Sequence, residues 1–253
     1  MENKKIKDFL KKWFAEIATK DCSSCSITCN LSCGDSPKYI AWKNGYSPTD
    51  LENVPQDSIL GLGCGNPFNF LNITKKETIL VLESGAGMDV FLASKKVGLE
   101  GKIIGISMTL EMIERSRKTA LMHGFTNVEF KMGEIDCLPI EDETIDVVIA
   151  NSAINLYLDK INVFKEIYRV IKVGGRLSVC DLVTNENLPE NVSNSFEAWA
   201  RGIGGALKKD EYVDKIVKSG FATAKILSQK PYTTDFYPKL RGKITSVQIQ
   251  TKK

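Results

Sequence analysis

Four closely spaced cysteines lie near the start of the chain, at Cys22, Cys25, Cys29 and Cys33. Thiolates are the ligands that zinc and iron–sulfur clusters prefer. On a straight helix the four would face within an arc of about 80° but spread over about 16 Å, so one ion can bind them all only if the segment is looped. The spacing predicts a bound metal ion or iron–sulfur cluster. The alternative is that they are small buried hydrophobic residues.

A second group that could do chemistry is the glycine-containing turn from Ser84 to Gly87. It follows a short apolar run with β-branched residues, 78–82, and precedes a helical stretch, 91–98. Glycines at a strand-to-helix turn are typical of nucleotide-binding α/β units. A glycine pair alone does not say which nucleotide is bound.

Histidine chemistry is almost absent, because His123 is the only histidine in the chain. It follows a predicted helix and precedes a strand, a position where a polar residue is common. The composition therefore argues against a Ser–His hydrolase site and against a metal site built from several histidines.

The candidate residues are positioned by alternating helices and strands. Apolar runs predict strands at 78–82, 102–106, 128–132, 145–151, 176–183, 222–228 and 244–251. Helical spacing predicts helices at 6–19, 110–122, 160–171, 196–199 and 209–218, with Gly174 and Gly175 ending the third. This alternation predicts an α/β fold with a doubly wound, mainly parallel sheet that binds its ligand at the carboxyl ends of the strands.

The segment ahead of the first strand has a different character. Residues 6–19 carry apolar side chains at helical spacing and a lysine-rich outer face, which predicts a docking helix. Residues 21–67 mix Cys, Ser, Gly, Asn and Pro without long-range periodicity, as in a lid. We therefore expect an N-terminal helix and cysteine-rich lid over 1–70, followed by the main α/β domain over 71–253.

The composition limits the function classes. The chain has 253 residues, 43% of them hydrophobic, and a formal net charge of +3 from 34 basic and 31 acidic residues. These charges are spread through the chain and form no basic stripe, which argues against a nucleic-acid partner. No apolar run is long enough for a membrane span, and no secretory signal is evident, so we expect a cytoplasmic protein without a membrane partner. In a reducing compartment, seven cysteines indicate metal, redox or substrate chemistry.

An ordered series of motifs identifies a family. It comprises GLGCGNP (61–67), ESGAGMD (83–89), IIGISMTLEMIERSR (103–117), GEIDCLP (133–139), IDVVIANSAINL (145–156) and RVIKVGGRL (169–177). Over residues 46–221 the chain resembles the arsenite S-adenosylmethionine methyltransferases, a family of class I methyltransferases. The resemblance implies a Rossmann-like, seven-stranded sheet with S-adenosylmethionine lying over the glycine turn.

The resemblance also implies which residues surround the cofactor. They are Glu83, Ser84, Gly85, Gly87, Ser107, Met108, Glu134, Ile135 and Asn151. Class I sites generally carry a carboxylate for the ribose hydroxyls at the end of the second strand, and here that position is Ser107. Glu83 stands where the family pattern has glycine. Its carboxylate would either repel the methionine carboxylate or pair with the methionine ammonium. Glu134 is expected to accept from the adenine amino group, and Tyr46 is a further candidate to line the donor pocket.

The acceptor implied by the resemblance is a soft metalloid. In this family three thiolates hold trivalent arsenic, which attacks the sulfonium methyl in line. Cys64 matches the first of these positions, whereas Ser152 and Gly202 stand at the other two. The chain is therefore expected to methylate a soft or thiol-bound small molecule, with Cys64 at the acceptor.

A hypothesis from a different class is also open. Glu83 and Ser107, together with the four N-terminal cysteines, are compatible with a diverged methyltransferase scaffold whose cofactor binding is weak or lost and which holds a metal ion or iron–sulfur cluster. Cys64 could join some of the N-terminal cysteines in such a site. The sequence leaves the oligomeric state open.

Overall fold

The computed structural model describes residues 2–19, 36–234 and 236–253. Its eight-stranded sheet consists of β1 (Thr78–Leu82), β2 (Lys102–Ser107), β3 (Val128–Met132), β4 (Ile145–Asn151), β5 (Ile171–Thr184), β6 (Leu207–Lys208), β7 (Lys225–Pro231) and β8 (Ile244–Lys252). The helices are α1 (Asn3–Thr19), α2 (Pro37–Lys43), α3 (Pro48–Glu52), α4 (Met88–Val97), α5 (Leu110–Met122), α6 (Lys160–Val170), α7 (Glu190–Ser193), α8 (Phe196–Ala200) and α9 (Lys209–Lys218).

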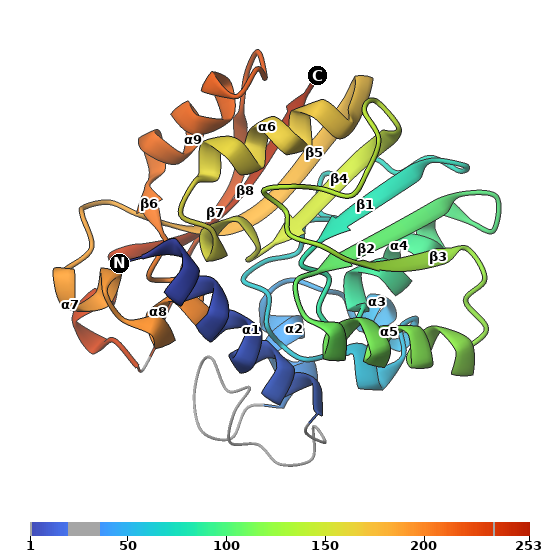
Figure 1. Ribbon diagram of the computed structural model, residues 1–253, viewed down its shortest axis with the longest axis horizontal. Helices are drawn as coiled ribbons and strands as arrows, with labels where there is room; N and C mark the ends of the chain where they lie inside the picture. The colour runs from blue at the N-terminus through green and yellow to red at the C-terminus, as the bar shows by residue number, and fades with distance from the viewer. Residues whose placement is uncertain (1, 20–35, 235) are drawn as a thin grey trace.

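Seven strands follow the order β3-β2-β1-β4-β5-β8-β7, and the two-residue β6 pairs with β5 beside this path (Figure 1). Strands β1 to β5 are parallel, whereas β8 runs antiparallel to both β5 and β7. The predicted Rossmann-like, seven-stranded fold is therefore confirmed. The strand order changes direction at β1, so the ends of β1, β2 and β4 meet at a point where ligands bind in such sheets.

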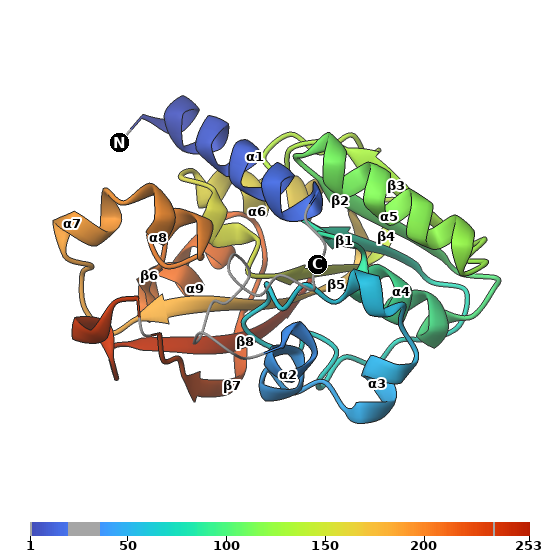
Figure 2. The ribbon, with the colours of Figure 1, turned by 90° about the horizontal axis from the view of Figure 1, so that it is seen from below.

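The alternation of side chains along β1 explains why helices cover both faces of the sheet. Leu80 and Leu82 belong to a buried cluster with residues of α1, α6 and α9. Ile79 and Val81 belong to a second buried cluster with residues of α2, α3, α4 and α5. Because successive side chains of a strand point to opposite faces, a strand buried on both sides is apolar throughout. The two helical layers are visible in Figures 1 and 2.

The predicted boundary at Gly174 and Gly175 is wrong. Helix α6 ends at Val170, and both glycines lie inside the long strand β5. Ile171 already has extended backbone and pairs with Ile145, and a bulge follows in the pairing of β4 with β5. Such a bulge accommodates the positive φ of Gly174, 81°, within a strand. The glycines thus mark an irregular strand and not a helix end.

The predicted strand 222–228 lies three residues too early at each end, since β7 covers Lys225–Pro231. This strand is at the edge of the sheet and is mostly exposed or half-buried. An edge strand has no continuous apolar run, so hydrophobicity locates it poorly.

Two short helices occupy the described part of the predicted lid. Ser36 caps α2 by accepting from the Tyr39 amide at 3.2 Å, and Ser47 caps α3 by accepting from the Asp50 amide at 3.0 Å. A proline follows each serine at the first helical position, where its missing N–H does no harm. Helices of seven and five residues are too short to show periodicity. The division at residue 70 stays a prediction.

Helix α1 docks on the domain as its apolar face predicts. Ile6 and Leu10 are buried in the cluster shared with α6 and α9. The helix packs against α5 and α8 and lies at the end of the sheet where the parallel strands stop (Figure 2). Phe14 of this helix lines the cavity described next. Within the described residues, no helix has the length and apolarity that a membrane crossing requires.

Candidate functional site

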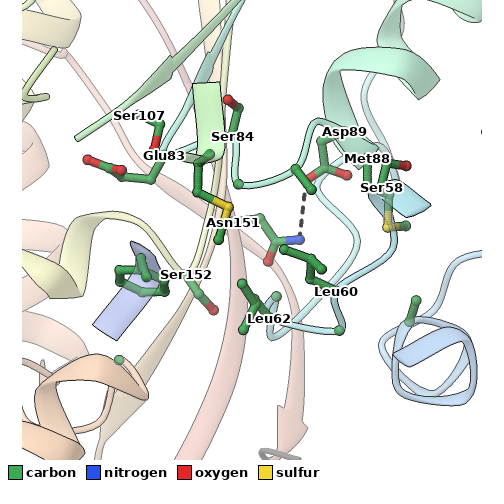
Figure 3. A pocket seen from close by; sticks show the side chains of 18 of the residues that line it. Ser58, Leu60, Leu62, Glu83, Ser84, Met88, Asp89, Ser107, Asn151 and Ser152 are labelled. Atoms are coloured by element: carbon green, nitrogen blue, oxygen red, sulfur yellow. Dashed lines mark hydrogen bonds between the residues drawn. The ribbon is translucent and has the colours of Figure 1, made fainter. Parts of the chain in front are cut away.

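A cavity opens where β1, β2 and β4 end (Figure 3). Its walls come from segments that are far apart in the sequence, including α1, the loop 58–63, the turn after β1, the ends of β2 and β4, and the loop 200–202. Five of the predicted cofactor residues line it, namely Glu83, Ser84, Gly85, Ser107 and Asn151. This is the position that the doubly wound sheet predicts for a ligand.

The glycine turn between β1 and α4 has the left-handed backbone that its sequence predicts. Gly85 and Gly87 have φ values of 53° and 95°, and the Gly87 amide donates to the Ser84 carbonyl at 2.9 Å. A Cβ at Gly87 would lie 2.8 Å from the Phe91 ring, so no larger residue fits there. A Cβ at Gly85 would meet nothing within 4 Å, because Gly85 faces open space. Gly87 therefore shapes the turn and Gly85 leaves room for a ligand.

Glu83 carries a side chain at a third left-handed position, with φ of 44°. One carboxylate oxygen accepts from the Tyr157 hydroxyl at 2.7 Å, and the other accepts from the Met108 amide at 3.2 Å. Burial raises the pKa of Glu83 to about 7, although the hydrogen bonds from Tyr157 and Met108 act in the opposite direction. The carboxylate is thus held firmly at the edge of the cavity.

Asn151, at the end of β4, joins three segments of the site. Its Oδ1 accepts from the Cys64 amide at 3.1 Å, and its Nδ2 donates to the Tyr46 hydroxyl at 3.0 Å. Tyr46 in turn donates to Asp89 at 2.6 Å, and Figure 3 shows the longer contact between Asn151 and Asp89 as a dashed line. Burial raises the pKa of Asp89 to about 6, against the effect of these hydrogen bonds. Asn151 therefore fixes the GLGCGNP loop to the cavity wall.

Glu134 and Ile135 lie beside the cavity and not among the residues that line it. Lys7 and Lys11 of α1 both form ion pairs with Glu134, the second at 2.7 Å. Burial alone would raise the pKa of Glu134, but these two lysines lower it. The Ile135 amide donates to the Tyr157 hydroxyl at 3.3 Å. Met108 is also outside the lining, and its amide is engaged by Glu83.

Cys64 lies behind the cavity wall. The Ser246 hydroxyl donates to the Cys64 carbonyl at 2.7 Å, and burial, followed by the charge of Asp181, raises the pKa of the thiol to about 12. Ser152 and Gly202 line the main cavity, whereas Cys64 lines a neighbouring one together with Cys180. The three positions of the family pattern are therefore divided between two neighbouring cavities, with Ser152 and Gly202 in one and Cys64 in the other.

Asp89 and Tyr157 were not predicted from the sequence. Asp89 lies in the first turn of α4, two residues after Gly87. An acid so close to the glycine turn could have been predicted from the sequence to lie at the cavity. Tyr157 acts through contacts between distant segments, for which no local pattern exists.

The predicted metal ligands Cys22, Cys25, Cys29 and Cys33 lie outside the described residues. Among the residues that the structure describes, no group of three or more His, Cys, Asp or Glu side chains is arranged to hold a metal ion. The metal or iron–sulfur prediction stays a prediction.

The comparisons with known proteins agree with this fold. A family model described as a methyltransferase domain matches residues 73–220, and the chain belongs to this family of class I, S-adenosylmethionine-dependent methyltransferase domains. Its relatives include the arsenite methyltransferase of Halobacterium salinarum, 35% identical over 91% of this chain and 60% of the relative. The human arsenite methyltransferase is 30% identical over 90% of this chain and 61% of the relative. The predicted resemblance to arsenite methyltransferases is confirmed.

A solved structure extends the comparison. The crystal structure of an arsenic(III) S-adenosylmethionine methyltransferase from Chlamydomonas reinhardtii matches with a TM-score of 0.67 and 26% identity, covering 85% of this chain and 72% of that chain. The chain spans about three fifths of the length of the two curated relatives named above.

The residues present fit S-adenosylmethionine. The Ser84 hydroxyl is buried without a hydrogen-bond partner among the described residues, at the turn where Gly85 leaves open space. Asp89, on the β4 side, places a carboxyl group in the cavity wall, which suits a ligand with a sulfonium and an ammonium group. Glu83 and Arg201 are the other charged residues among the described residues that line the cavity.

Proposed function

We propose that this chain transfers a methyl group from S-adenosylmethionine to a soft or thiol-bound small acceptor. S-adenosylmethionine supplies an electrophilic methyl group on a sulfonium. The turn Ser84–Gly87 would hold the cofactor against the end of β1, while Asn151 and Asp89 would define the wall on the β4 side. The observation that carries the proposal is one cavity that contains both this turn and the positions Ser152 and Gly202.

The acceptor is proposed to be soft because the relatives that match about nine tenths of this chain are arsenite methyltransferases. The titratable groups in its lining are Tyr46, Glu83, Asp89 and Arg201. Tyr46, Glu83 and Asp89 are engaged in the hydrogen bonds described above. A displacement at an activated methyl depends mainly on proximity and in-line alignment, provided that the acceptor is already nucleophilic. Trivalent arsenic bound to small thiols, or a thiolate, meets that condition.

Cofactor binding is tested by calorimetric titration of the purified chain with S-adenosylmethionine and S-adenosylhomocysteine. We expect saturable binding of both. A Gly85→Val variant is the matched test of the cavity, because its new side chain enters the open space beside the turn and also strains a left-handed backbone. Binding by the variant equal to that of the original chain, or no binding by the original chain at millimolar cofactor, contradicts the proposal.

The acceptor is tested with arsenite in the presence of small thiols, by following transfer of labelled methyl groups from the cofactor. We expect arsenite binding to weaken in Cys64→Ser, since the Cys64 amide donates to Asn151 of the cavity wall at 3.1 Å. Cys137→Ser is the control, because Cys137 is exposed and lies outside the cavity lining. If Cys64→Ser binds arsenite unchanged, arsenic is not the acceptor that this site holds.

A second function, binding of a metal ion or iron–sulfur cluster by the N-terminal cysteines, is carried by their spacing alone. Metal analysis and the absorbance spectrum of anaerobically purified protein test it. A colourless, metal-free protein with free thiols would count against this function.

A further inference from the structure

We propose that Glu83 supplies the carboxylate that accepts the ribose hydroxyls of the methyl donor, in place of the carboxylate that class I sites carry at the position of Ser107. The inference rests on the proposed function, since it concerns the nucleoside part of the same ligand. The acid that is missing at Ser107, the last residue of β2, would thus be replaced by Glu83, which directly follows β1.

The direction of the Glu83 side chain is the first support. One carboxylate oxygen accepts from the Met108 amide at 3.2 Å, and Met108 follows directly after Ser107, the last residue of β2. The carboxylate therefore starts from β1 and reaches the end of β2. Glu83 and Ser107 line the same cavity, and Figure 3 shows them together on one side of it.

The order of the strands separates this role from the two expected from sequence. Strand β1 lies between β2 and β4, and Glu83 leans towards β2. Asn151 and Asp89 are on the β4 side, together with Ser152 and the acceptor positions. A contact with the methionine part of the donor, whether repulsive or attractive, would require the carboxylate to point the other way. The nucleoside side of the cavity is the side that Glu83 faces.

The carboxylate is oriented and still has free acceptor positions. The Tyr157 hydroxyl donates to one oxygen at 2.7 Å, and Tyr157 is itself held by the Ile135 amide at 3.3 Å. An ionised carboxylate has about four acceptor positions. Two are used by Tyr157 and Met108, so each oxygen can accept one further hydrogen bond. Two neighbouring ribose hydroxyls require the same number.

The backbone at Glu83 is the second, independent support. Its φ of 44° is in the left-handed region, where any residue other than glycine is strained. Glycine would adopt this conformation at less cost and would also remove a partly buried carboxyl group. Backbone strain of this kind persists mainly where a function requires the side chain. Here the side chain reaches the one place in the cavity where the expected acid is missing.

The experiment compares calorimetric affinities for S-adenosylhomocysteine and its 2′-deoxy and 3′-deoxy analogues. In the original chain, removing a hydroxyl is expected to weaken binding about tenfold, the usual effect of losing a hydrogen bond to a charged group. Glu83→Gln, which keeps the shape of the side chain, is expected to lower the affinity for S-adenosylhomocysteine by a similar factor. The deoxy analogues are then expected to bind this variant nearly as well as the parent ligand does.

A double variant relocates the acid. Glu83→Gly combined with Ser107→Asp restores the class I arrangement, and we expect it to recover both the affinity and the sensitivity to the ribose hydroxyls. Glu83→Gly alone is the matched control, and its affinity for S-adenosylhomocysteine is expected to stay low. Circular dichroism and thermal unfolding establish that each variant is folded before its affinity is compared.

The outcomes separate the two levels of the proposal. If the original chain binds no adenosyl ligand, the proposed function fails. If it binds S-adenosylhomocysteine but Glu83→Gln keeps the full sensitivity to the ribose hydroxyls, only the role of Glu83 is overturned. Tighter binding by Glu83→Gln would also overturn it, because Glu83 would then repel the ligand.

Discussion

The Glu83 carboxylate connects the end of β1 with the Met108 amide after β2 and with the Tyr157 hydroxyl. The sequence shows an acid in place of glycine, but the direction of its side chain depends on Tyr157, which lies 74 positions further along the chain. No local pattern contains that contact. By contrast, the roles of Gly85 and Gly87 follow from backbone sterics alone and could be predicted.

Burial of Glu83 makes stability depend on pH. Its pKa is raised from an ordinary 4.5 to about 7, so between these values the folded chain binds more protons than the unfolded chain. Stability from this group is therefore fully present below about pH 4.5 and is lost as the pH rises to about 7. Lys11 opposes this shift, whereas Glu134 adds to it.

We predict that Glu83→Gln removes this part of the pH dependence. The unfolding free energy of the variant, relative to the original chain, is expected to increase by roughly 2–3 kcal/mol between pH 4.5 and pH 8. Urea unfolding at several pH values measures the difference. Asp89 and Asp181 titrate in an overlapping range, but both are present in the two proteins and their effects largely cancel. A difference that stays constant with pH would show that the pKa of Glu83 is the same in the folded and unfolded chains.

The thiols outside the N-terminal segment are expected to differ in reactivity. Cys64 and Cys180 are buried, and burial raises the pKa of both, whereas Cys137 is exposed. Because the thiolate is the reactive form, iodoacetamide at pH 8 is expected to label Cys137 well before the other two. Peptide mapping by mass spectrometry measures the order. Labelling of the unfolded protein serves as the reference. Equal labelling of the three thiols in the folded protein would show that the cavity lined by Cys64 and Cys180 is open to solvent.

At the scale of elements, several helices and strands were predicted with the bounds that the structure shows. The bounds of α5, β3, β4 and α9 agree with the sequence prediction at both ends. The errors occur where local signals are ambiguous. Gly174 and Gly175 are equally consistent with a helix end and with a bulged strand, and only the pairing with β4 decides between them.

Helix α1 is expected to be held mainly by its apolar face. Lys7 and Lys11 form partly exposed ion pairs with Glu134, and Lys7 also pairs with Asp136 at 2.8 Å. The double variant Lys7→Ala, Lys11→Ala is expected to lose about 2 kcal/mol or less of unfolding free energy. Leu10 is fully buried, and Leu10→Ala is expected to cost about 2–5 kcal/mol. Urea unfolding compares the two variants. A larger loss for the lysine variant would reverse this assignment.

For the whole molecule, the alternation of helices and strands was sufficient to predict a doubly wound sheet and the edge at which its ligand binds. It did not predict which distant loops close the cavity. Phe14, Tyr46 and Gly202 reach the site from three separate segments, and their meeting depends on tertiary packing. The fold was therefore predicted more completely than the site.

Because the cavity joins so many segments, ligand binding is expected to stabilise the whole domain. At a concentration 100 times its Kd, S-adenosylhomocysteine is expected to add about 2.7 kcal/mol to the unfolding free energy. For a chain of this length that corresponds to a rise in Tm of roughly 5–10 °C. Differential scanning calorimetry measures the rise in Tm, with the same buffer without S-adenosylhomocysteine as the control. A rise confined to a partial, separate transition would show that the cavity segments unfold independently.

The presence of an acid at position 83 and its absence at position 107 also bear on how such a site could arise by single substitutions. Starting from glycine at 83 and an acid at 107, gaining Glu83 first would place two carboxylates in one cavity, where each disfavours ionisation of the other. Losing the acid at 107 first would leave neither position with a carboxylate. Both routes therefore pass through a weaker intermediate. Ser107→Asp and Glu83→Gly, made singly in this chain, recreate those two intermediates, and their joint effect on ligand affinity is expected to be far from additive.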